Sequence, residues 1–246
     1  MPGSLEGVQV ISVVMPAHNE AGYLETAVRE VSEGIRARDH DLEVLVVENG
    51  STDDTLAIAR GLADELPHVR VSSRAVADYG AALRDGVLAA TGDFVVTFDV
   101  DYDDLGFVDD ALALLSRAAP PAIVVGSKRA PGARDQRPWP RRFVTAVFSW
   151  LLRFGFSLSV SDTHGMKAMQ RAAVDPLLRL CRFRTDLFDT ELVIRTQRAG
   201  LPLAELPVTA QERRPSRTPI WRRVPRTLVG LVELRLTLWR EGRGSA

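Results

Sequence analysis

The chain has 246 residues, of which 46% are hydrophobic and 26% are charged, and its formal net charge at pH 7 is −1. Composition and length indicate a globular protein with one large α/β domain, or one domain and a small appendage. The balanced charge gives no indication of a nucleic-acid partner. No stretch has the roughly 18 uncharged apolar residues that span a bilayer.

The first residues lack the basic and apolar regions of a secretory signal. The single cysteine, Cys181, excludes an internal disulfide and suits a reducing compartment. We therefore predict a cytoplasmic protein in which Cys181 is a buried thiol.

Strands and helices alternate through the first hundred residues. A β-branched strand begins near Val8 and stops at Pro16, and the strand in "LEVLVVENGS" closes at the turn Asn49-Gly50. Further strands are expected at 69–74 and 93–101. Helices are expected at about 20–38, at 51–66 with Ser51 or Thr52 as N-cap, and at 79–92 with Gly92 as C-cap.

The α/β pattern continues in the second half of the chain. Elements are expected at 108–118 (helix), 122–129 (strand), 143–156 (helix), 189–199 (helix, ending at Gly200), 201–213 (strand) and 225–243 (amphipathic helix). A loop rich in proline and arginine precedes the helix at 143–156. We divide the chain into a domain of residues 1–210 and a basic, amphipathic C-terminal segment of residues 211–246.

The predicted strands are continuous apolar runs, which is the pattern of a parallel sheet covered by helices on both faces. In such α/β folds, ligands bind beyond the carboxyl ends of the strands. The first, second and fourth strands are followed by the loops "PAHNE", "ENGSTD" and "DVDYDD". We expect these loops to meet at one edge of the sheet and to form the functional site.

Four aspartates follow the apolar run "FVVTF" of the fourth strand within six positions: Asp99, Asp101, Asp103 and Asp104. An EF-hand calcium loop would need Gly in place of Asp104, Glu in place of Asp110, and a helix before the loop. A receiver-type phosphoacceptor pocket would need an acid pair after the first strand, which ends in Pro-Ala-His. A solvated acidic turn and a hard divalent cation remain. We predict the cation, Mg²⁺ or Mn²⁺, because it offsets carboxylate repulsion and takes its other ligands from a diphosphate.

Six arginines and no acid occur in "RRPSRTPIWRRVPR" (213–226). Arginine binds phosphate in a bidentate fashion, so this segment indicates an anionic ligand or membrane surface, with a solvated basic face as the alternative. The following helix carries Trp239, and the apolar helix at 143–156 carries Trp150. Amphipathic helices with Trp lie in the membrane interface. We predict peripheral binding at the inner face of the cell membrane.

Seven sequence blocks occur in a fixed order between about residues 8 and 217. They are "VVMPAHNE", "VLVVENGSTDDT", "R-x4-YGAALRDG-x4-ATGD", "DVDYDD", "VVGSKR", "SDTHGMKAMQR" and "ELVIRTQRAGLPLAELPV". The series resembles the family 2 glycosyltransferases of GT-A fold, and most the dolichol- or polyprenyl-phosphate mannose synthases. The resemblance implies a Rossmann-like, mostly parallel α/β sheet with helices on both faces and a C-terminal amphipathic helix.

The resemblance also implies roles for individual residues. Asp99 and Asp101 are the implied Asp-x-Asp metal ligands, with Asp103 as the third, and Asp101 is implied in catalysis. Asp189 and Glu191 in "LFDTEL" are candidates for a general base or, alternatively, helix-capping acids. The implied nucleotide and phosphate contacts are Pro16, His18, Glu20, Val47, Asn49, Asp99, Val100, Lys128, Arg142, Arg213 and Arg217.

Two positions depart from the family's blocks. The usual Asp-Asp after the second strand is Glu48-Asn49, and an Asn amide can both donate to and accept from a nucleobase. His18 replaces a common Tyr or Phe.

The implied reaction is an inverting transfer of a hexose, with mannose favoured. The donor is a nucleoside diphosphate sugar, with GDP-mannose favoured, and the acceptor is polyprenyl or dolichyl phosphate. A lipid monophosphate arrives ionised and needs no base, whereas a hydroxyl acceptor needs one. A family 2 transferase with a soluble hydroxyl acceptor and a non-catalytic nucleotide-sugar-binding subunit are the alternatives. A separate membrane-anchoring subunit is a further candidate partner.

Overall fold

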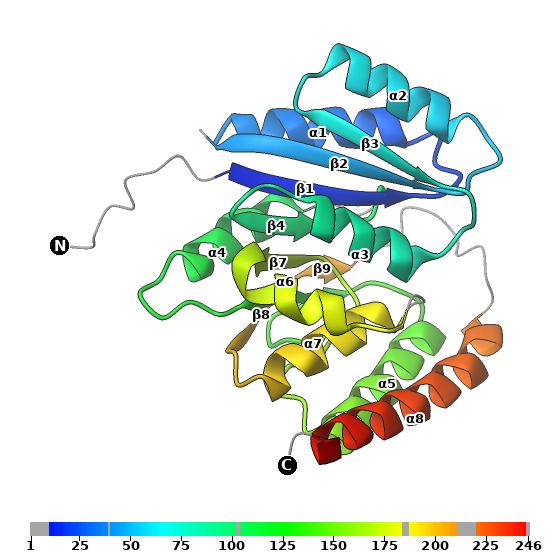
Figure 1. Cartoon of the computed structure of the whole chain (residues 1–246), viewed down its shortest axis with the longest axis vertical. Helices are drawn as coiled ribbons and strands as arrows, with labels where there is room; N and C mark the ends of the chain where they lie inside the picture. Colours follow the sequence, from blue (N-terminus) through cyan, green and yellow to red (C-terminus); the bar gives the residue numbers. More distant parts are fainter. Residues whose placement is uncertain (1–9, 39, 102–103, 184–186, 211–219, 245–246) are drawn as a thin grey trace.

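A computed structural model describes residues 10–38, 40–101, 104–183, 187–210 and 220–244. Seven of the described strands form one sheet in the order β3-β2-β1-β4-β7-β5-β8 (Figure 1). These strands are β1 (Val10–Ala17), β2 (Asp41–Asn49), β3 (Val69–Arg74), β4 (Phe94–Thr97), β5 (Ile123–Ser127), β7 (Lys167–Gln170) and β8 (Leu203–Pro207). Neighbouring strands are parallel except at β7, which runs antiparallel to β4 and β5.

Helices cover both faces of this sheet, because successive side chains of a strand point to opposite sides. On one face lie α1 (Leu24–Arg36), α2 (Thr55–Glu65) and α4 (Leu105–Leu115), and on the other α3 (Tyr79–Ala89), α6 (Arg171–Leu180) and α7 (Phe188–Arg198). Val13 and Met15 of β1 belong to the first core, and Val14 belongs to the second. The predicted α/β class and mostly parallel sheet are confirmed.

The sheet reverses its strand order at β1, since β2 lies on one side of it and β4 on the other. A crevice for ligands forms at the carboxyl edge of such a switch point. α3 packs closely above this point because Gly86 has no side chain. A Cβ there would lie 2.4 Å from Val14 Cγ1 and 2.8 Å from Val47 Cγ2. The first residue of α3 is thereby placed near the carboxyl edge.

The helices α5 (Trp139–Phe156) and α8 (Ile220–Gly244) lie side by side at the lower end of the molecule (Figure 1). Leu234 and Leu238 of α8 belong to the second core, as does Leu152 of α5. Within the described part of the chain, neither these nor the other helices combine the length and apolar character needed to cross a bilayer. The predicted division at residue 210 stays a prediction.

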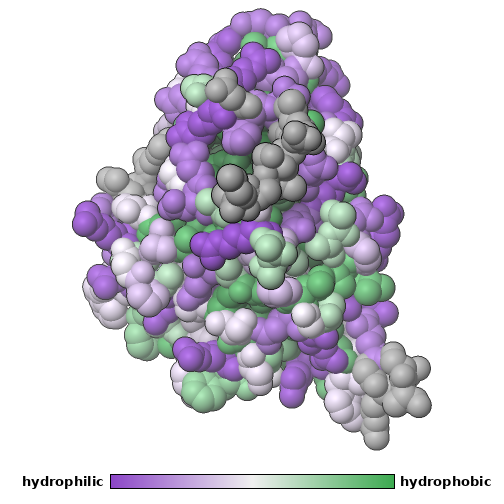
Figure 2. Space-filling model, turned by 90° about the vertical axis from the view of Figure 1, so that its left-hand side faces the viewer, coloured by the Kyte–Doolittle hydropathy of each residue, from purple (hydrophilic) through white to green (hydrophobic). Residues whose placement is uncertain are grey.

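A short second sheet pairs β6 (Arg134–Asp135) in parallel with β9 (Thr209–Ala210). It joins the loop after β5 to the segment that leads from β8 toward α8. Hydropathy also divides the molecule. In Figure 2 the end at the height of α1 and α2 is mostly hydrophilic, and hydrophobic side chains are more frequent at mid-height and below.

Several local predictions are wrong. The N-cap of α2 is Asp54 rather than Ser51 or Thr52, and the C-cap of α3 is Ala90 rather than Gly92. α4 begins three residues before position 108, because Asp104 caps it and accepts a hydrogen bond from the Phe107 N–H at 3.1 Å. No element was predicted for β7 and α6, which arise from "SDTHGMKAMQR" and the residues after it.

Two other local predictions are confirmed. Gly200 follows α7 with a φ of +73°, a left-handed conformation suited to glycine at a helix end. Cys181 is a buried free thiol, and burial raises its pKa to about 12. Its thiolate is therefore scarce near neutral pH, which agrees with a packing role.

Candidate active site

The loops that follow β1 and β2 are joined to each other at the carboxyl edge. Asn19 is left-handed, with a φ of 55°, and its Oδ1 accepts a hydrogen bond from the Thr52 N–H at 2.8 Å. Its backbone N–H donates to Ser51 Oγ at 3.0 Å. His18 Nδ1 donates to the carbonyl of Asn49 at 2.8 Å. These contacts hold the two predicted nucleotide-binding loops as one unit.

Three further residues of the predicted nucleotide site are buried at this edge. Pro16 and Val47 are opposite each other in the register of β1 and β2. Glu20 is 6% exposed, and its backbone N–H donates to Thr55 Oγ1 at 2.7 Å. The strand pairing and this hydrogen bond fix the backbone at the carboxyl edge of the sheet.

Glu48 and Asn49, the two residues in place of an acid pair, are both buried and hydrogen-bonded. Asn49 Oδ1 accepts from the backbone N–H of Asp78 at 2.8 Å. The Glu48 carboxylate accepts from the Ser51 N–H and the Ser73 hydroxyl. Burial opposes ionisation of Glu48, but the hydrogen bonds from Ser73 and Ser51 outweigh it and lower its pKa. Both side chains therefore connect the end of β2 to neighbouring loops.

The predicted acid pair follows β4. Solvent reaches Asp99, but the surrounding protein removes much of its hydration and Asp101 adds a second negative charge. Both effects raise the pKa of Asp99. The Tyr79 hydroxyl donates to Asp99 Oδ1 at 3.0 Å. Val100, between the acids, is 4% exposed and packs into the core, which anchors the turn.

The composition of this turn suits a hard cation, since carboxylate oxygens are the ligands that Mg²⁺ and Mn²⁺ prefer. The predicted third ligand, Asp103, lies outside the described residues. Among the residues that are described, no group of three His, Cys, Asp or Glu side chains is placed to hold a metal ion. A cation at Asp99 and Asp101 would thus take further ligands from substrate, water or Asp103.

A buried ion pair lies beside the acid pair. Lys167 Nζ is 2.8 Å from Asp189 Oδ1, and their side chains are only 1% and 5% exposed. The contact lacks hydrogen-bond geometry at Asp189 Oδ1, whereas Lys167 Nζ donates to the Gly165 carbonyl at 2.8 Å. The charge of Asp189 raises the pKa of Asp99, after burial and Asp101, so Asp189 lies near the acid pair.

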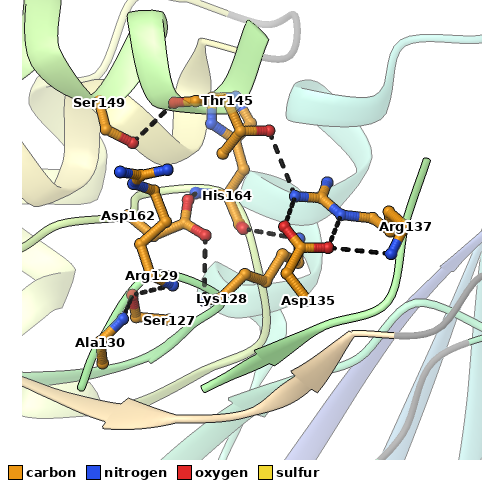
Figure 3. A network of polar contacts seen from close by, with 10 residues as sticks. All are labelled: Ser127, Lys128, Arg129, Ala130, Asp135, Arg137, Thr145, Ser149, Asp162 and His164. Carbon is orange, nitrogen blue, oxygen red and sulfur yellow. Dashed lines mark hydrogen bonds and ion pairs between the residues drawn. The ribbon is translucent and has the colours of Figure 1, made fainter. Parts of the chain in front are cut away.

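Lys128, directly after β5, and His164, in the loop that leads into β7, join this group. Lys128 Nζ donates to the His164 carbonyl at 3.1 Å, and its positive charge also acts on Asp99 (Figure 3). Burial lowers the pKa of His164, so the ring is neutral near pH 7. Phe148 of α5 contacts the His164 ring edge-on, with centroids 5.1 Å apart.

Glu191, the second candidate base, is in a different environment from Asp189. Its side chain is fully buried and accepts hydrogen bonds from the backbone N–H groups of Arg182 and Phe183, each at 2.8 Å. Arg195 Nε donates to it at 2.8 Å. The two predicted bases are therefore separated: Asp189 lies near the acid pair, and Glu191 joins α7 to the loop before it.

The model of glycosyl transferase family 2 matches residues 12–176, which span the sheet from β1 to β7 and the acid pair. The chain belongs to that family. The predicted resemblance is thereby confirmed.

Relatives of this glycosyltransferase include proteins of different lengths. Glycosyltransferase AglD of Haloferax volcanii is 34% identical over 210 residues, which are 82% of this chain and 33% of AglD. The uncharacterized glycosyltransferase Rv0539 of Mycobacterium tuberculosis is 35% identical over 200 residues, which are 81% of this chain and 84% of that protein. Dolichyl-phosphate β-glucosyltransferase ALG5A of Trichomonas vaginalis is 26% identical over 213 residues, which are 82% of this chain and 66% of ALG5A. The chain thus spans a third of AglD and about two thirds of ALG5A.

The fold is also that of solved glycosyltransferases. Glucosyl-3-phosphoglycerate synthase from Mycobacterium tuberculosis, solved with Mn²⁺, UDP-glucose and phosphoglyceric acid, superposes with a TM-score of 0.68 at 23% identity. The match covers 92% of this chain and 79% of the synthase. The family 2 chain therefore has the GT-A fold that the sequence blocks implied.

The arginines of the predicted site are found in different parts of the chain, and only one of them lies within the described residues. Arg142 is exposed on α5, and its charge helps lower the pKa of Asp135. Asp135 in turn pairs with Arg137, which donates to Thr145 Oγ1 at 3.3 Å and so joins β6 to α5 (Figure 3). Arg213 and Arg217 lie outside the described residues.

Sequence reasoning missed two residues of the site. Lys167 is in the block "SDTHGMKAMQR" and Tyr79 in "YGAALRDG", so both lie within segments that carried the resemblance. The signal for Lys167 was a lysine directly before the apolar residues Ala168 and Met169, where a buried charge requires a partner. Tyr79 gave no such signal, because its contact with Asp99 depends on how α3 meets β4.

Proposed function

We propose that this family 2 chain transfers a hexose from a nucleoside diphosphate sugar to a polyprenyl phosphate at a membrane surface. The observation that carries the proposal is the Asp99–Asp101 pair at the switch point of the sheet, with the Lys167–Asp189 pair beside it. The first pair suits a cation-bound diphosphate, and the second limits which acceptors can react.

The acid pair fits a divalent cation. Reduced hydration and the charge of Asp101 disfavour ionised Asp99, and a bound cation would reverse that effect. We propose that Asp99, Asp101 and Asp103 hold Mg²⁺ or Mn²⁺. Such an ion would stabilise the negative charge of the departing diphosphate.

For the donor, we favour a uridine diphosphate sugar over GDP-mannose. Asn49 Oδ1 already accepts from Asp78, so the amide N–H groups are what Asn49 can offer, and these match the carbonyl oxygens of uracil. Guanine presents N–H donors at its pairing edge, but Glu48, the nearest acid, is occupied by Ser51 and Ser73. The name of ALG5A specifies glucosyl transfer, and the solved synthase bound UDP-glucose. Glucose is therefore the hexose to test first.

The transfer itself forms one bond and breaks one. A phosphate oxygen of the acceptor bonds to the anomeric carbon, the bond from that carbon to the diphosphate oxygen breaks, and its electron pair leaves with the nucleoside diphosphate. Attack opposite to the leaving group inverts the anomeric centre. We propose that Lys128, whose charge acts on Asp99, interacts with phosphate oxygens at this point.

The Lys167–Asp189 pair favours a phosphate acceptor over a hydroxyl. A hydroxyl must lose a proton to a base, and Asp189 would have to accept it while Lys167 lies 2.8 Å away in a buried site. A lipid monophosphate has a second pKa of about 6 and is already ionised. The role we propose for Asp189 is to pair with Lys167 at the side of the site, and the role for Glu191 is structural. Lys128, Arg142, Arg213 and Arg217 are the proposed partners of the donor and acceptor phosphates.

The surface of α5 supports a membrane location. Five large apolar side chains recur along the exposed side of this helix at intervals of three or four residues: Trp139, Phe143, Val147, Trp150 and Phe154. The neighbouring α8 exposes Leu228, Val229, Val232, Leu236 and Trp239. Arg235 of α8 lies over the Phe156 ring of α5, 5.8 Å from its centroid, which ties the two helices together. Exposed apolar stripes with tryptophan are typical of helices that lie in a membrane interface.

Arginines border these stripes. Arg142 and Arg153 on α5, and Arg226, Arg235 and Arg240 on α8, are exposed. Each basic residue near an anionic leaflet contributes about 1 kcal/mol to binding. We propose peripheral binding at the inner face of the cell membrane, with a membrane-anchoring subunit as the alternative occupant of the two stripes.

A soluble hydroxyl acceptor is the second candidate. It is favoured by the position of Asp189 near the acid pair, where a general base would be needed. A non-catalytic sugar-nucleotide-binding subunit has no such support, because the acid pair and the ion pair are both present.

The proposal is tested by offering acceptors side by side. The purified protein receives labelled UDP-glucose or GDP-mannose with Mn²⁺, and undecaprenyl phosphate in detergent, undecaprenol, phosphoglyceric acid or a panel of sugar alcohols. We expect label in the lipid phosphate with UDP-glucose and none in undecaprenol. Faster transfer to a soluble hydroxyl, lost in Asp189→Asn, would make the second candidate correct. Absence of transfer with every acceptor would leave only a binding function.

A further inference from the structure

The first residue of α3 contacts the acid pair from the side of β2. The Tyr79 hydroxyl donates to Asp99 Oδ1 at 3.0 Å. This hydrogen bond uses one of the two carboxylate oxygens. We propose that Tyr79 is a positioning residue for the divalent cation: it fixes the rotation of the Asp99 carboxylate, so that the second oxygen faces the ion. The inference rests on the cation of the proposed function.

The position of Tyr79 is itself well determined. Asp78 caps α3 by accepting a hydrogen bond from the Ala81 N–H at 3.2 Å. The N–H of Asp78 donates to Asn49 Oδ1 at 2.8 Å, which attaches the start of α3 to the end of β2. At the other end of the helix, Gly86 allows contact with Val14 and Val47 within van der Waals range. Contacts at both ends of α3 therefore fix the helix, and with it the position of Tyr79, before any ligand binds.

A fixed carboxylate matters at this position because Asp99 lies two residues after the end of β4 and has Asp101 two residues further on. Two neighbouring carboxylates repel and tend to rotate apart, which is the wrong arrangement for a shared cation. A hydroxyl donor to one oxygen opposes that rotation. Hydrogen-bond partners of metal ligands generally change metal affinity or activity by about 10- to 100-fold.

The hydrogen bond from the Asp78 N–H to Asn49 gives Asn49 a second role. Through Asp78, Asn49 sets the position of α3 and hence of Tyr79, so the nucleobase side and the metal side of the site are connected by hydrogen bonds. Binding of nucleotide at the end of β2 and binding of metal at the end of β4 would then both depend on the position of the first residues of α3.

The test removes one hydroxyl. Mn²⁺ binding to Tyr79→Phe and to the wild-type protein is followed by the electron paramagnetic resonance signal of free Mn²⁺ with UDP present. We expect Mn²⁺ to bind about 10- to 100-fold more weakly to the variant. The Mn²⁺ concentration for half-maximal transfer should rise by the same factor, with kcat recovering at saturating Mn²⁺. Tyr23→Phe is the matched control, because Tyr23 is about half exposed before α1, and it should leave Mn²⁺ affinity unchanged.

The Mn²⁺ affinity and the metal-free stability of Tyr79→Phe together decide whether Tyr79 positions the metal ligand. Equal Mn²⁺ affinity in Tyr79→Phe and wild type would overturn it. A loss matched by a lower metal-free melting temperature would also overturn it, because the hydroxyl would then be structural. A wild-type protein that binds no Mn²⁺ removes both this inference and the proposed cation. Since the resonance measurement needs no acceptor, a protein that binds Mn²⁺ but transfers no sugar would refute the proposed function alone.

Discussion

The half of the site from β1 to β4, which we propose binds the nucleotide, differs from the proposed acceptor half, from β5 to α8, in what holds its residues. In the nucleotide half, side chains bond to the backbone of the neighbouring loop, as Asn19 does with Thr52 and Asn49 with Asp78. In the acceptor half, a buried ion pair and two helices with exposed apolar stripes lie around the site. The difference suggests a rigid donor site and an acceptor site that is completed by a lipid surface.

The two halves meet at Asp99, which receives a hydrogen bond from Tyr79 in the first half and the charges of Asp189 and Lys128 in the second. If this division is correct, a change in one half should alter the binding of its own substrate more than that of the other.

The largest effect is expected at the meeting point. Asp101→Asn removes the charge of one proposed metal ligand without removing core packing, and sugar transfer should fall by at least about 10³-fold, or about 4 kcal/mol. EDTA should reproduce the loss in the wild type, and Mn²⁺ should reverse it. Rates are measured by release of UDP, and full activity in excess EDTA would contradict the prediction.

A large effect on stability is expected in the acceptor half. Lys167→Met leaves the Asp189 carboxylate buried without its cation, which typically costs about 3–5 kcal/mol in the free energy of unfolding. The double variant Lys167→Met/Asp189→Asn should recover much of that loss. Urea titration measures the free energy of unfolding of the wild type, the single variant and the double variant.

The control for this pair is in the nucleotide half. Arg29 and Glu65 form an exposed ion pair, with side chains 36% and 56% exposed. Arg29→Met should change stability little, because solvent screens such pairs. Equal losses in Lys167→Met and Arg29→Met would show that the burial of the acceptor-half pair has no energetic importance.

Membrane binding should depend on the α5 stripe. Trp150→Ser and Phe154→Ser each remove a large apolar side chain, for which burial contributes about 1.5–3 kcal/mol. Partitioning onto vesicles with anionic lipid should fall about tenfold or more per substitution, and it should weaken with salt. Val76→Ser is the control, since Val76 is 74% exposed outside both helices. An equal decrease with Val76→Ser, or none with the α5 variants, would place the membrane contact elsewhere.

A smaller effect is expected for donor choice. Asn49→Asp keeps the acceptor for the Asp78 N–H but replaces amide donors with a carboxylate, so it should favour GDP relative to UDP. A mismatched buried partner costs about 1–3 kcal/mol, or about 5- to 150-fold in the ratio of donor affinities. Calorimetry with UDP and GDP in Mn²⁺ gives that ratio. The acceptor KM should not change, and an unaltered ratio would place the base away from Asn49.

The smallest effect concerns acid stability. Hydrogen bonds from Ser73 and Ser51 lower the folded-state pKa of Glu48 below its ordinary value of 4.5, against the effect of burial. A group whose pKa is lower in the folded state stabilises the fold above its unfolded pKa. That contribution is lost as the pH falls through the folded value. Glu48→Gln should therefore be less stable than wild type at pH 7, with the difference shrinking below pH 4.5. Melting temperatures at successive pH values measure this, and a constant difference would refute it.

The nucleotide half was the more predictable from sequence. Its strands are apolar runs in the order of the chain, and Pro16, Asn49 and Asp99 lie within two residues of the ends of β1, β2 and β4. Parallel strands bring those ends to one edge, so the position of the acid pair followed from the pattern alone. Local capping was less predictable. Several neighbouring polar residues can each serve as the N-cap of a helix. For this reason the N-caps of α2 and α4, Asp54 and Asp104, differ from the predicted starts of these helices.

The acceptor half was less predictable because its contacts link distant segments. β7 is four residues long and antiparallel, and its lysine reads as a surface residue until Asp189 of α7 is placed opposite it. Asp189 and Glu191 are two residues apart and look equivalent in sequence. Only the fold separates the acid near Asp99 from the acid that joins α7 to the backbone at Arg182.

The bond that the enzyme forms tests the account most directly. The protein is incubated with UDP-glucose carrying ¹³C at the anomeric carbon, Mn²⁺ and undecaprenyl phosphate, and the lipid product is examined by ¹³C and ³¹P nuclear magnetic resonance. We predict an anomeric carbon coupled to a single phosphorus that resonates as a phosphodiester, with the configuration inverted from that of the donor. Anomeric label recovered in a glycoside without phosphorus coupling, or with retained configuration, would contradict the account.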